Sequence, residues 1–188
     1  CHNCINSITS LSIMNFCSSC AHPVAVTIPP GDHLPRHVCP ACGIIHYQNP
    51  RIIAGCVPVW EDRILICRRA IEPRHGYWTL PAGFMENNET VAQGAAREAR
   101  EEALADVEIG SLLAVIDVLH TQQVHMMFRG RLRNPNFGVG SESLEVKLVT
   151  EREIPWDELA FQSVKFSLER FLEDRATSLE RHHMLTLP

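Results

Sequence analysis

The sequence lacks the features that would place the protein in or across a membrane. Its longest nearly apolar stretches, residues 52–60 and 111–118, are far shorter than the ~20 residues that a membrane-spanning helix needs. Residues 1–12 contain neither a basic start nor a long apolar stretch, so they do not have the pattern of a secretory signal. We therefore expect a protein without a membrane span, located in the cytoplasm.

Basic charge is also scarce. The 188 residues include 17 Lys and Arg against 22 Asp and Glu, a formal net charge of −5, and only Lys147 and Lys165 are lysines. This balance has the wrong sign for nonspecific binding to a polyanion, which disfavours nucleic acid as a partner. The preference for arginine favours forked recognition of carboxylates or phosphates. We therefore expect any anionic small molecule to be bound locally.

The composition is otherwise that of a globular protein, with 45% hydrophobic and 21% charged residues. These values disfavour a collagen-like, disordered or coiled-coil chain, and the length allows one ordinary domain with a small appendage. Several segments have the apolar pattern of strands: 51–59, 63–67, 112–119, 124–132 and 146–149. Residues 156–172 have the spacing of a closing helix. We expect an extension at 1–13, a small unit at 14–48 and a mixed α/β domain at 49–188.

Six of the eight cysteines form three Cys-x-x-Cys pairs before residue 43. The pairs Cys17/Cys20 and Cys39/Cys42 have a separation that lets two tight turns present four thiolates to one tetrahedral zinc ion. Unlinked thiols or a redox pair are the alternative, but a redox motif does not require a second matched pair. The sequence therefore predicts a zinc ribbon. We assign no site to the pair Cys1/Cys4.

A segment rich in helix formers carries the most informative charges. Thr90 and Gln93 can form a capping box at the start of a helix that runs to Ala103. Glu98, Glu101 and Glu102 stand at positions i, i+3 and i+4 of this helix, so their carboxylates project together. Small residues form what we expect to be the face against the sheet: Ala92, Ala96, Ala99 and Ala103.

An acidic helix face exposed to water is the alternative explanation of this cluster. Like charges at i and i+4 cost about 0.2–0.5 kcal/mol per pair, and a purely structural helix would more usually alternate the signs. A divalent cation removes the repulsion, and Mg²⁺ prefers a few carboxylates combined with phosphate oxygens of a substrate. The cluster therefore predicts phosphate chemistry.

This segment resembles the Nudix box, G-x5-E-x7-R-E-U-x-E-E-x-G-U, which it matches at Gly83, Glu89, Arg97, Glu98, Glu101 and Glu102. One departure is Leu104, where the family has a glycine that ends the helix in a left-handed conformation. A zinc ribbon before a Nudix domain resembles the NADH pyrophosphatase group, but the S-Q-P-W-P-F-P-x-S motif of that group is missing. Segments 47–50, 76–83, 142–145 and 154–161 instead resemble the plant-type FAD and ADP-ribose pyrophosphatases.

The resemblance implies an α+β fold, a Nudix α/β/α sandwich with a mixed sheet. It also implies that Glu98 and Glu102 are the principal ligands of Mg²⁺ or Mn²⁺, that Glu101 completes the cluster, and that Arg97 orients it. A backbone carbonyl near Gly83 would be a further ligand.

The remaining candidates are weaker. Arg51 and Arg69 are candidates for pairing with phosphate, although either could be an ordinary surface arginine. Trp78 is a candidate for stacking on a nucleobase, although a tryptophan at this place is as often part of the core. We predict that Glu145, with Glu142 as the lesser candidate, supplies a catalytic carboxylate from outside the box; the alternative is an exposed glutamate at a strand edge.

The predicted function is hydrolysis of the diphosphate bond in a nucleoside diphosphate linked to another moiety, of the ADP-ribose or FAD type, with release of AMP. The alternatives are an NADH pyrophosphatase and a nucleotide sensor or adaptor that retains the fold without catalysis. The intact acidic cluster argues against the sensor. A homodimer is expected from the resemblance alone.

Overall fold

The computed structural model describes residues 14–188, and it divides into two compact units after Asn49. The predicted extension 1–13, with its pair of cysteines, lies outside the described residues. The first unit contains a small antiparallel sheet in the order β1–β2–β3. Its strands are β1 (Ala25–Thr27), β2 (Arg36–Val38) and β3 (Ile45–His46).

The second unit is built on an eight-stranded mixed sheet with the order β10–β5–β4–β9–β8–β11, while β6 pairs with β5 and β7 pairs with β4. The pairs β4/β9 and β8/β11 are parallel and the other pairs are antiparallel. Its strands are β4 (Arg51–Trp60), β5 (Arg63–Arg69), β6 (Trp78–Thr79), β7 (Ala82–Phe84), β8 (Val107–Val118), β9 (Gln123–Leu132), β10 (Ser143–Val149) and β11 (His183–Leu187).

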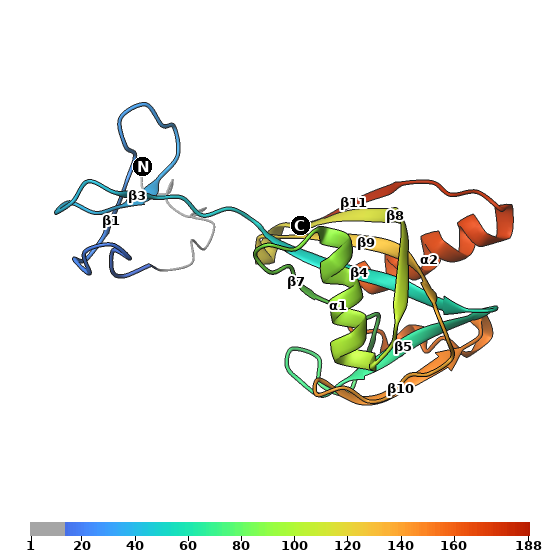
Figure 1. The fold of residues 1–188 in the computed structure, drawn as a ribbon. Coiled ribbons are helices and arrows are strands. Elements are labelled where there is room, and N and C mark those ends of the chain that lie inside the picture. The colour runs from blue at the N-terminus through green and yellow to red at the C-terminus, as the bar shows by residue number, and fades with distance from the viewer. Residues whose placement is uncertain (1–13) are drawn as a thin grey trace. The chain divides into compact units, whose positions relative to one another are not determined.

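Two helices cover opposite faces of this sheet, α1 (Val91–Ala103) and α2 (Gln162–Thr177) (Figure 1). The side chains of β5 alternate between the two cores: Leu65 and Cys67 pack with α1, whereas Ile64 and Ile66 pack with α2. This period of two is what a strand buried on both faces requires. The predicted α/β/α sandwich with a mixed sheet is therefore confirmed.

The closing helix begins later than the sequence predicts. Its apolar residues do face the core, with Val164 and Leu168 buried. However, Trp156–Glu158 is a separate 3-10 turn, and the backbone N–H of Ala160 donates to the carbonyl of Trp78. Because this stretch is used to contact β6, the helix starts only at Gln162.

The sequence predicts no strand after the closing helix, where His182 and His183 are polar. In the structure, β11 adds a parallel edge strand to β8. The buried carboxylate of Asp174 on α2 accepts hydrogen bonds from Arg129, from Arg181 and from Nε2 of His183. Burial opposes ionisation, but the bonds from Arg181 and His183 lower the pKa of Asp174 to about 2. This ionised carboxylate ties the end of the chain to the sheet.

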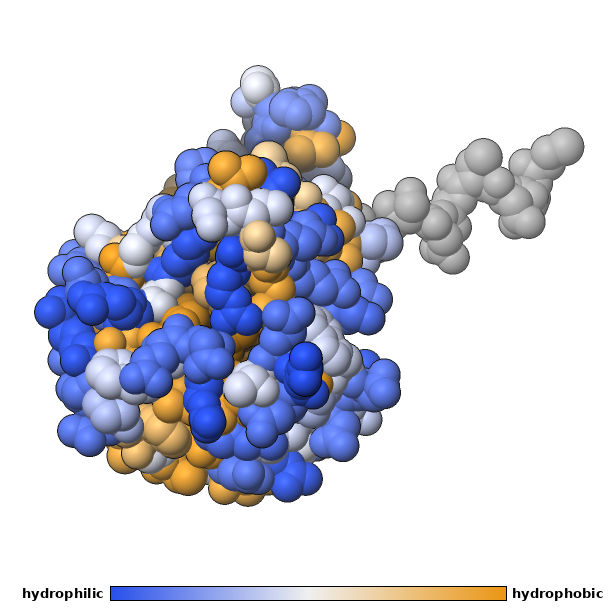
Figure 2. Space-filling model, turned by 90° about the vertical axis from the view of Figure 1, so that its right-hand side faces the viewer, coloured by the Kyte–Doolittle hydropathy of each residue, from blue (hydrophilic) through white to orange (hydrophobic). Residues whose placement is uncertain are grey.

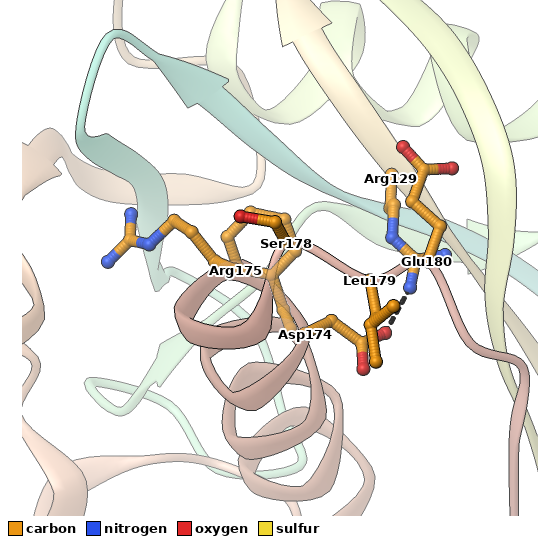
Figure 3. Close-up of a pocket in the computed structure, with 7 residues that line it drawn as sticks. Arg129, Asp174, Arg175, Ser178, Leu179 and Glu180 are labelled. Atoms are coloured by element: carbon orange, nitrogen blue, oxygen red, sulfur yellow. Dashed lines mark hydrogen bonds and ion pairs between the residues drawn. The ribbon is translucent and has the colours of Figure 1, made fainter.

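A hollow lies beside this carboxylate, at the end of α2 (Figure 3). On the face drawn in Figure 2, hydrophilic residues dominate and apolar ones are interspersed among them. Within residues 14–188, no helix is both long and apolar enough to span a bilayer.

Candidate functional site

Four cysteines of the first unit converge on one point. Sγ of Cys17 lies 3.7 Å from Sγ of Cys42, and Sγ of Cys20 lies 3.5 Å from those of both Cys39 and Cys42. Zinc–sulfur bonds of about 2.3 Å in a tetrahedron place the sulfurs about 3.8 Å apart, close to these distances. The four sulfur atoms all lie within 4.8 Å of one another, and no other group of three or more His, Cys, Asp or Glu side chains in residues 14–188 is gathered in this way.

Two similar turns present these thiols. Ala21 and Gly43 each follow the second cysteine of a pair, have positive φ angles, and donate a backbone hydrogen bond to the carbonyl of the first cysteine. Hydrogen bonds from backbone N–H groups, led by Ser19 at Cys17 and by Cys42 at Cys39, lower the pKa of these two thiols to about 7. At the other two thiols, Cys20 and Cys42, backbone hydrogen bonds lower the pKa, but hydrogen bonds with neighbouring cysteines, led by Cys39, raise it by more, that of Cys42 to about 12. Zinc binds thiolates, and the fit of a zinc ion rests on the spacing of the four sulfurs, which is that of a tetrahedral site.

The helix α1 has the predicted start and an unusual end. Thr90 accepts from the N–H of Gln93, whose side chain accepts in return from the N–H of Thr90. At the other end, Leu104 adopts φ 50° and ψ 26°, the left-handed conformation that the family gives to glycine. The helix therefore ends where the box requires, in a conformation that costs a leucine about 1–2 kcal/mol.

The predicted contact face of α1 is partly wrong. Three alanines of α1 are fully buried: Ala95, Ala99 and Ala103. Ala92 and Ala96 are only half-buried. The helix is rotated relative to the predicted face, because the acidic pair also turns inward. Glu98 is 8% exposed and Glu102 is 6% exposed.

Burial changes the chemistry of this pair. Removal from water raises the pKa of Glu98, and it raises the pKa of Glu102 to about 8, with a further contribution from the charge of Glu98. Oε2 of Glu102 is buried and has no hydrogen-bond partner. A buried carboxylate oxygen without a partner is costly for the protein alone, but it is a suitable ligand for a divalent cation.

A glycine makes room for one of these carboxylates. Gly83 lies on β7, and a Cβ atom there would be 2.4 Å from Oε1 of Glu98. Any side chain at this position would have to push the carboxylate away from the sheet. The backbone of this glycine therefore lies directly against the carboxylate of Glu98.

Arg97 connects the acidic residues of the box. Its Nη1 donates to Glu98 at 2.7 Å and to Glu101 at 3.0 Å. Its Nε and Nη2 donate to the two oxygens of Glu89, and Nη2 also donates to the carbonyl of Phe84. The sequence gives Glu89 no role of its own, although its spacing of eight residues from Arg97 is the signal for this contact. The arginine fixes the direction of Glu98.

The three substrate-binding candidates lie in different surroundings. Nε of Arg69 donates to the carbonyl of Pro73, and the guanidinium lies over the ring of Phe161. The charge of Arg69 lowers the pKa of Glu102, but burial raises that pKa by more. Arg51 lies over the ring of Phe84 on β7. Neither ring was identified from the sequence as a support.

Trp78 is buried in the core, with 4% exposure, and Lys147 lies 4.0 Å from the centre of its ring. Stacking on a nucleobase needs an open face, which Trp78 lacks in this arrangement. The burial of Trp78 therefore favours the alternative, a core residue, over a substrate-binding one.

The two glutamates outside the box also differ. Glu145 lies on β10 opposite Arg68, with an ion-pair distance of 3.9 Å and a half-exposed side chain. The charge of Glu142, in the loop before β10, contributes to raising the pKa of both Glu98 and Glu102. Glu142 is thus electrostatically coupled to the buried pair, whereas Glu145 has an arginine as its partner.

We predict that the purified protein contains about one zinc ion per chain, because a ribbon of this size cannot bury enough apolar surface to be stable alone. Elemental analysis of Cys39→Ser should show that the zinc is lost. Cys56→Ala is the matched control, since it removes a buried thiol in β4 and should retain the zinc. A full complement of zinc in Cys39→Ser would contradict the site.

We also predict that, without added divalent cations, the free energy of unfolding falls between pH 5 and pH 8. The folded state holds the Glu102 proton up to about pH 8, whereas the unfolded state releases it near the usual pKa of 4.5. Stability is therefore lost as pH rises through this window, and Glu102→Gln should flatten the profile in urea titrations. Glu101→Gln keeps the buried carboxyl and should retain the fall; a steep profile in Glu102→Gln would refute the assignment.

Comparison with known families agrees with both units. The family described as "Nudix N-terminal" matches residues 15–48, and the family described as "NUDIX domain" matches residues 49–184. A crystal structure of a NUDIX hydrolase from Nitrosomonas europaea is 52% identical, with a TM-score of 0.90, and the match covers 93% of this chain and 99% of that one.

Among curated proteins, the "NAD-capped RNA hydrolase NudC" of Chromobacterium violaceum is 41% identical over 88 residues, which are 46% of this chain and 31% of that protein. The "ADP-ribose pyrophosphatase" of Methanocaldococcus jannaschii is 33% identical over 69 residues, 37% of this chain and 41% of that protein. The matches thus cover less than half of these relatives. The match to the NUDIX domain spans most of the chain, which therefore belongs to the NUDIX hydrolase family and carries the zinc-ribbon unit before that domain.

Proposed function

We propose that the protein hydrolyses the diphosphate bond of a nucleoside diphosphate linked to another moiety, with Mg²⁺ or Mn²⁺, and that it releases AMP from adenosine substrates. The observation that carries the proposal is the buried pair Glu98 and Glu102, one helical turn apart, with an oxygen of Glu102 that no protein group satisfies. Membership of the NUDIX family supports the same chemistry.

In this proposal Glu98 and Glu102 hold the divalent cation, Glu101 completes the cluster from its exposed position, and a backbone carbonyl near Gly83 adds an oxygen. Two carboxylates with phosphate oxygens of the substrate suit Mg²⁺, which tolerates few protein ligands. When bound, the cation neutralises the diphosphate and lowers the pKa of a coordinated water.

The arginines have separate tasks. Arg97 holds Glu98 and Glu101 in place through one hydrogen bond to each, and two further bonds to Glu89 fix the guanidinium itself. It therefore acts on the carboxylates rather than on the substrate. Arg69 is fixed by Pro73 and Phe161, which leaves its terminal nitrogens to pair with a phosphate. Arg51, supported by Phe84, is a second candidate for this pairing.

We propose Glu142 as the carboxylate that accepts the proton of the attacking water, and Glu145 as the lesser candidate. This reverses the order expected from the sequence. The coupling of Glu142 to Glu98 and Glu102 supports it, whereas the ion pair with Arg68 engages Glu145. A general base must lie within reach of the proton that it removes, and the charge coupling of this exposed loop glutamate to the acidic pair supports such a place for it.

The proposal also names candidate substrates. ADP-ribose and FAD are the leading candidates, and the similarity to an ADP-ribose pyrophosphatase supports the first. The second candidate is a pyridine dinucleotide, free or attached to RNA, because several relatives are named NAD-capped RNA hydrolases. The acidic balance of the chain still argues against extensive contact with RNA. Homodimerisation and a cytoplasmic location are parts of the same proposal.

Incubation with ADP-ribose, FAD, NADH and an RNA that begins with NAD, each with Mg²⁺, tests the proposal by product analysis. We expect AMP with ribose 5-phosphate from ADP-ribose, or AMP with FMN from FAD. Glu98→Gln should lower turnover by at least about a hundredfold, about 2.7 kcal/mol of barrier, since it removes a charged ligand. Glu108→Gln is the control, because this exposed glutamate lies on β8 and pairs with Arg131.

Two outcomes would contradict the proposal. Release of free adenine or of inorganic pyrophosphate as the main product would show that another bond is broken. Binding of a nucleotide without turnover of any of the four substrates would favour the sensor or adaptor.

A further inference from the structure

A loop between β9 and β10 is attached to the end of the helix that carries the acidic pair. The last carbonyls of a helix have no partner inside the helix. Here the N–H of Gly138 donates to the carbonyl of Ala103 at 2.8 Å, and the N–H of Gly140 donates to the carbonyl of Glu102 at 3.1 Å. The loop therefore satisfies carbonyls of the same helical turn that presents Glu102.

Gly140 is required here by space. A Cβ atom on Gly140 would lie 1.8 Å from the carbonyl oxygen of Glu101, far inside any possible contact. Its φ angle is not positive, so a larger residue would be acceptable to the backbone if the helix were absent. The loop thus approaches the last turn of α1 as closely as a backbone without a side chain allows.

The same loop leads directly to Glu142 and is fixed again just beyond it. The carbonyl of Glu142 accepts from the N–H of Ala70, which follows β5, at 2.8 Å, and the N–H of Ser143 donates to the carbonyl of Gly140. Glu142 therefore lies between two attachments, one to α1 and one to the end of β5. Its backbone cannot move away from the acidic pair unless one attachment breaks.

We propose that Gly140 is a positioning residue, which sets the place of Glu142 relative to Glu98 and Glu102 by docking its loop on the carbonyl end of α1. The inference rests on the proposed function, because it assigns a purpose to Glu142 in that reaction. In this proposal the loop does more than cap the helix. Its main-chain hydrogen bonds join α1, which carries Glu98 and Glu102, to the loop that carries Glu142.

Gly140→Ala tests the inference, because its added methyl group must separate the loop from the helix. We expect kcat of the folded protein at saturating substrate and Mg²⁺ to fall at least about tenfold. The thermal midpoint should fall by several degrees, because the hydrogen bonds between the loop and α1 are lost. Gly110→Ala is the matched control: its Cβ would lie 3.4 Å from the nearest atom, the carbonyl oxygen of Arg129, and it should leave kcat unchanged.

A double-mutant cycle separates positioning from general damage. If Gly140 acts through Glu142, then Gly140→Ala should lower kcat by less than about twofold in a Glu142→Gln background. Equal losses of kcat in both backgrounds would overturn the inference. A fully active Glu142→Gln would also overturn it, while hydrolysis by the parent protein would leave the proposed function standing.

Amide hydrogen exchange gives a readout that does not depend on turnover. In the protein without Mg²⁺, the amides of residues 138 and 140 should be protected in the parent and should exchange faster in Gly140→Ala. Fast exchange of both amides in the parent would show that the loop is not docked, even if no substrate were turned over. If Gly140→Ala does not fold, Val139→Gly replaces it, since this exposed side chain can be removed and the loop loosened. Unchanged kcat in Val139→Gly, together with faster exchange of the amides of residues 138 and 140 than in the parent, would then overturn the inference.

Discussion

The burial of two like-charged carboxylates, one turn apart on α1, is the constraint on which the surrounding structure depends. Glu98 and Glu102 repel each other and lose contact with water, so the protein alone cannot satisfy both in their ionised forms. Several features answer this requirement. Gly83 leaves space for one carboxylate and Arg97 donates to it. Oε2 of Glu102 has no hydrogen-bond partner, and it is the oxygen that we propose as a ligand of a divalent cation.

The packing of α1 follows from the same constraint. The helix can bring carboxylates to the sheet only if its neighbouring side chains are small, and Ala95, Ala99 and Ala103 meet that need. They contact small residues of the sheet in turn, among them Ala54 and Cys56 on β4. The buried thiols of β4 and β5 have pKa values raised by burial, and they act as small apolar groups.

The sequence predicts the features that depend on local spacing. The paired cysteines, the capping box and the Glu98/Glu102 spacing are visible because each lies within a few residues, and the fold class follows from strand and helix periods. The sequence does not reveal contacts between distant segments, such as Asp174 with Arg129 or Gly140 with the end of α1. It also left Trp78 open between core packing and base stacking, because both need a large flat side chain; the structure buries it.

The most direct test of the central claim is the number of protons released when Mg²⁺ binds at pH 7. Glu102, with a pKa of about 8, is mostly protonated at that pH without the cation, and it must ionise to become a ligand. Calorimetric titrations in two buffers with different ionisation enthalpies should therefore give different binding enthalpies, corresponding to release of up to about one proton per ion. Glu102→Gln should remove the difference between buffers. Identical enthalpies for the parent protein in both buffers would contradict the account.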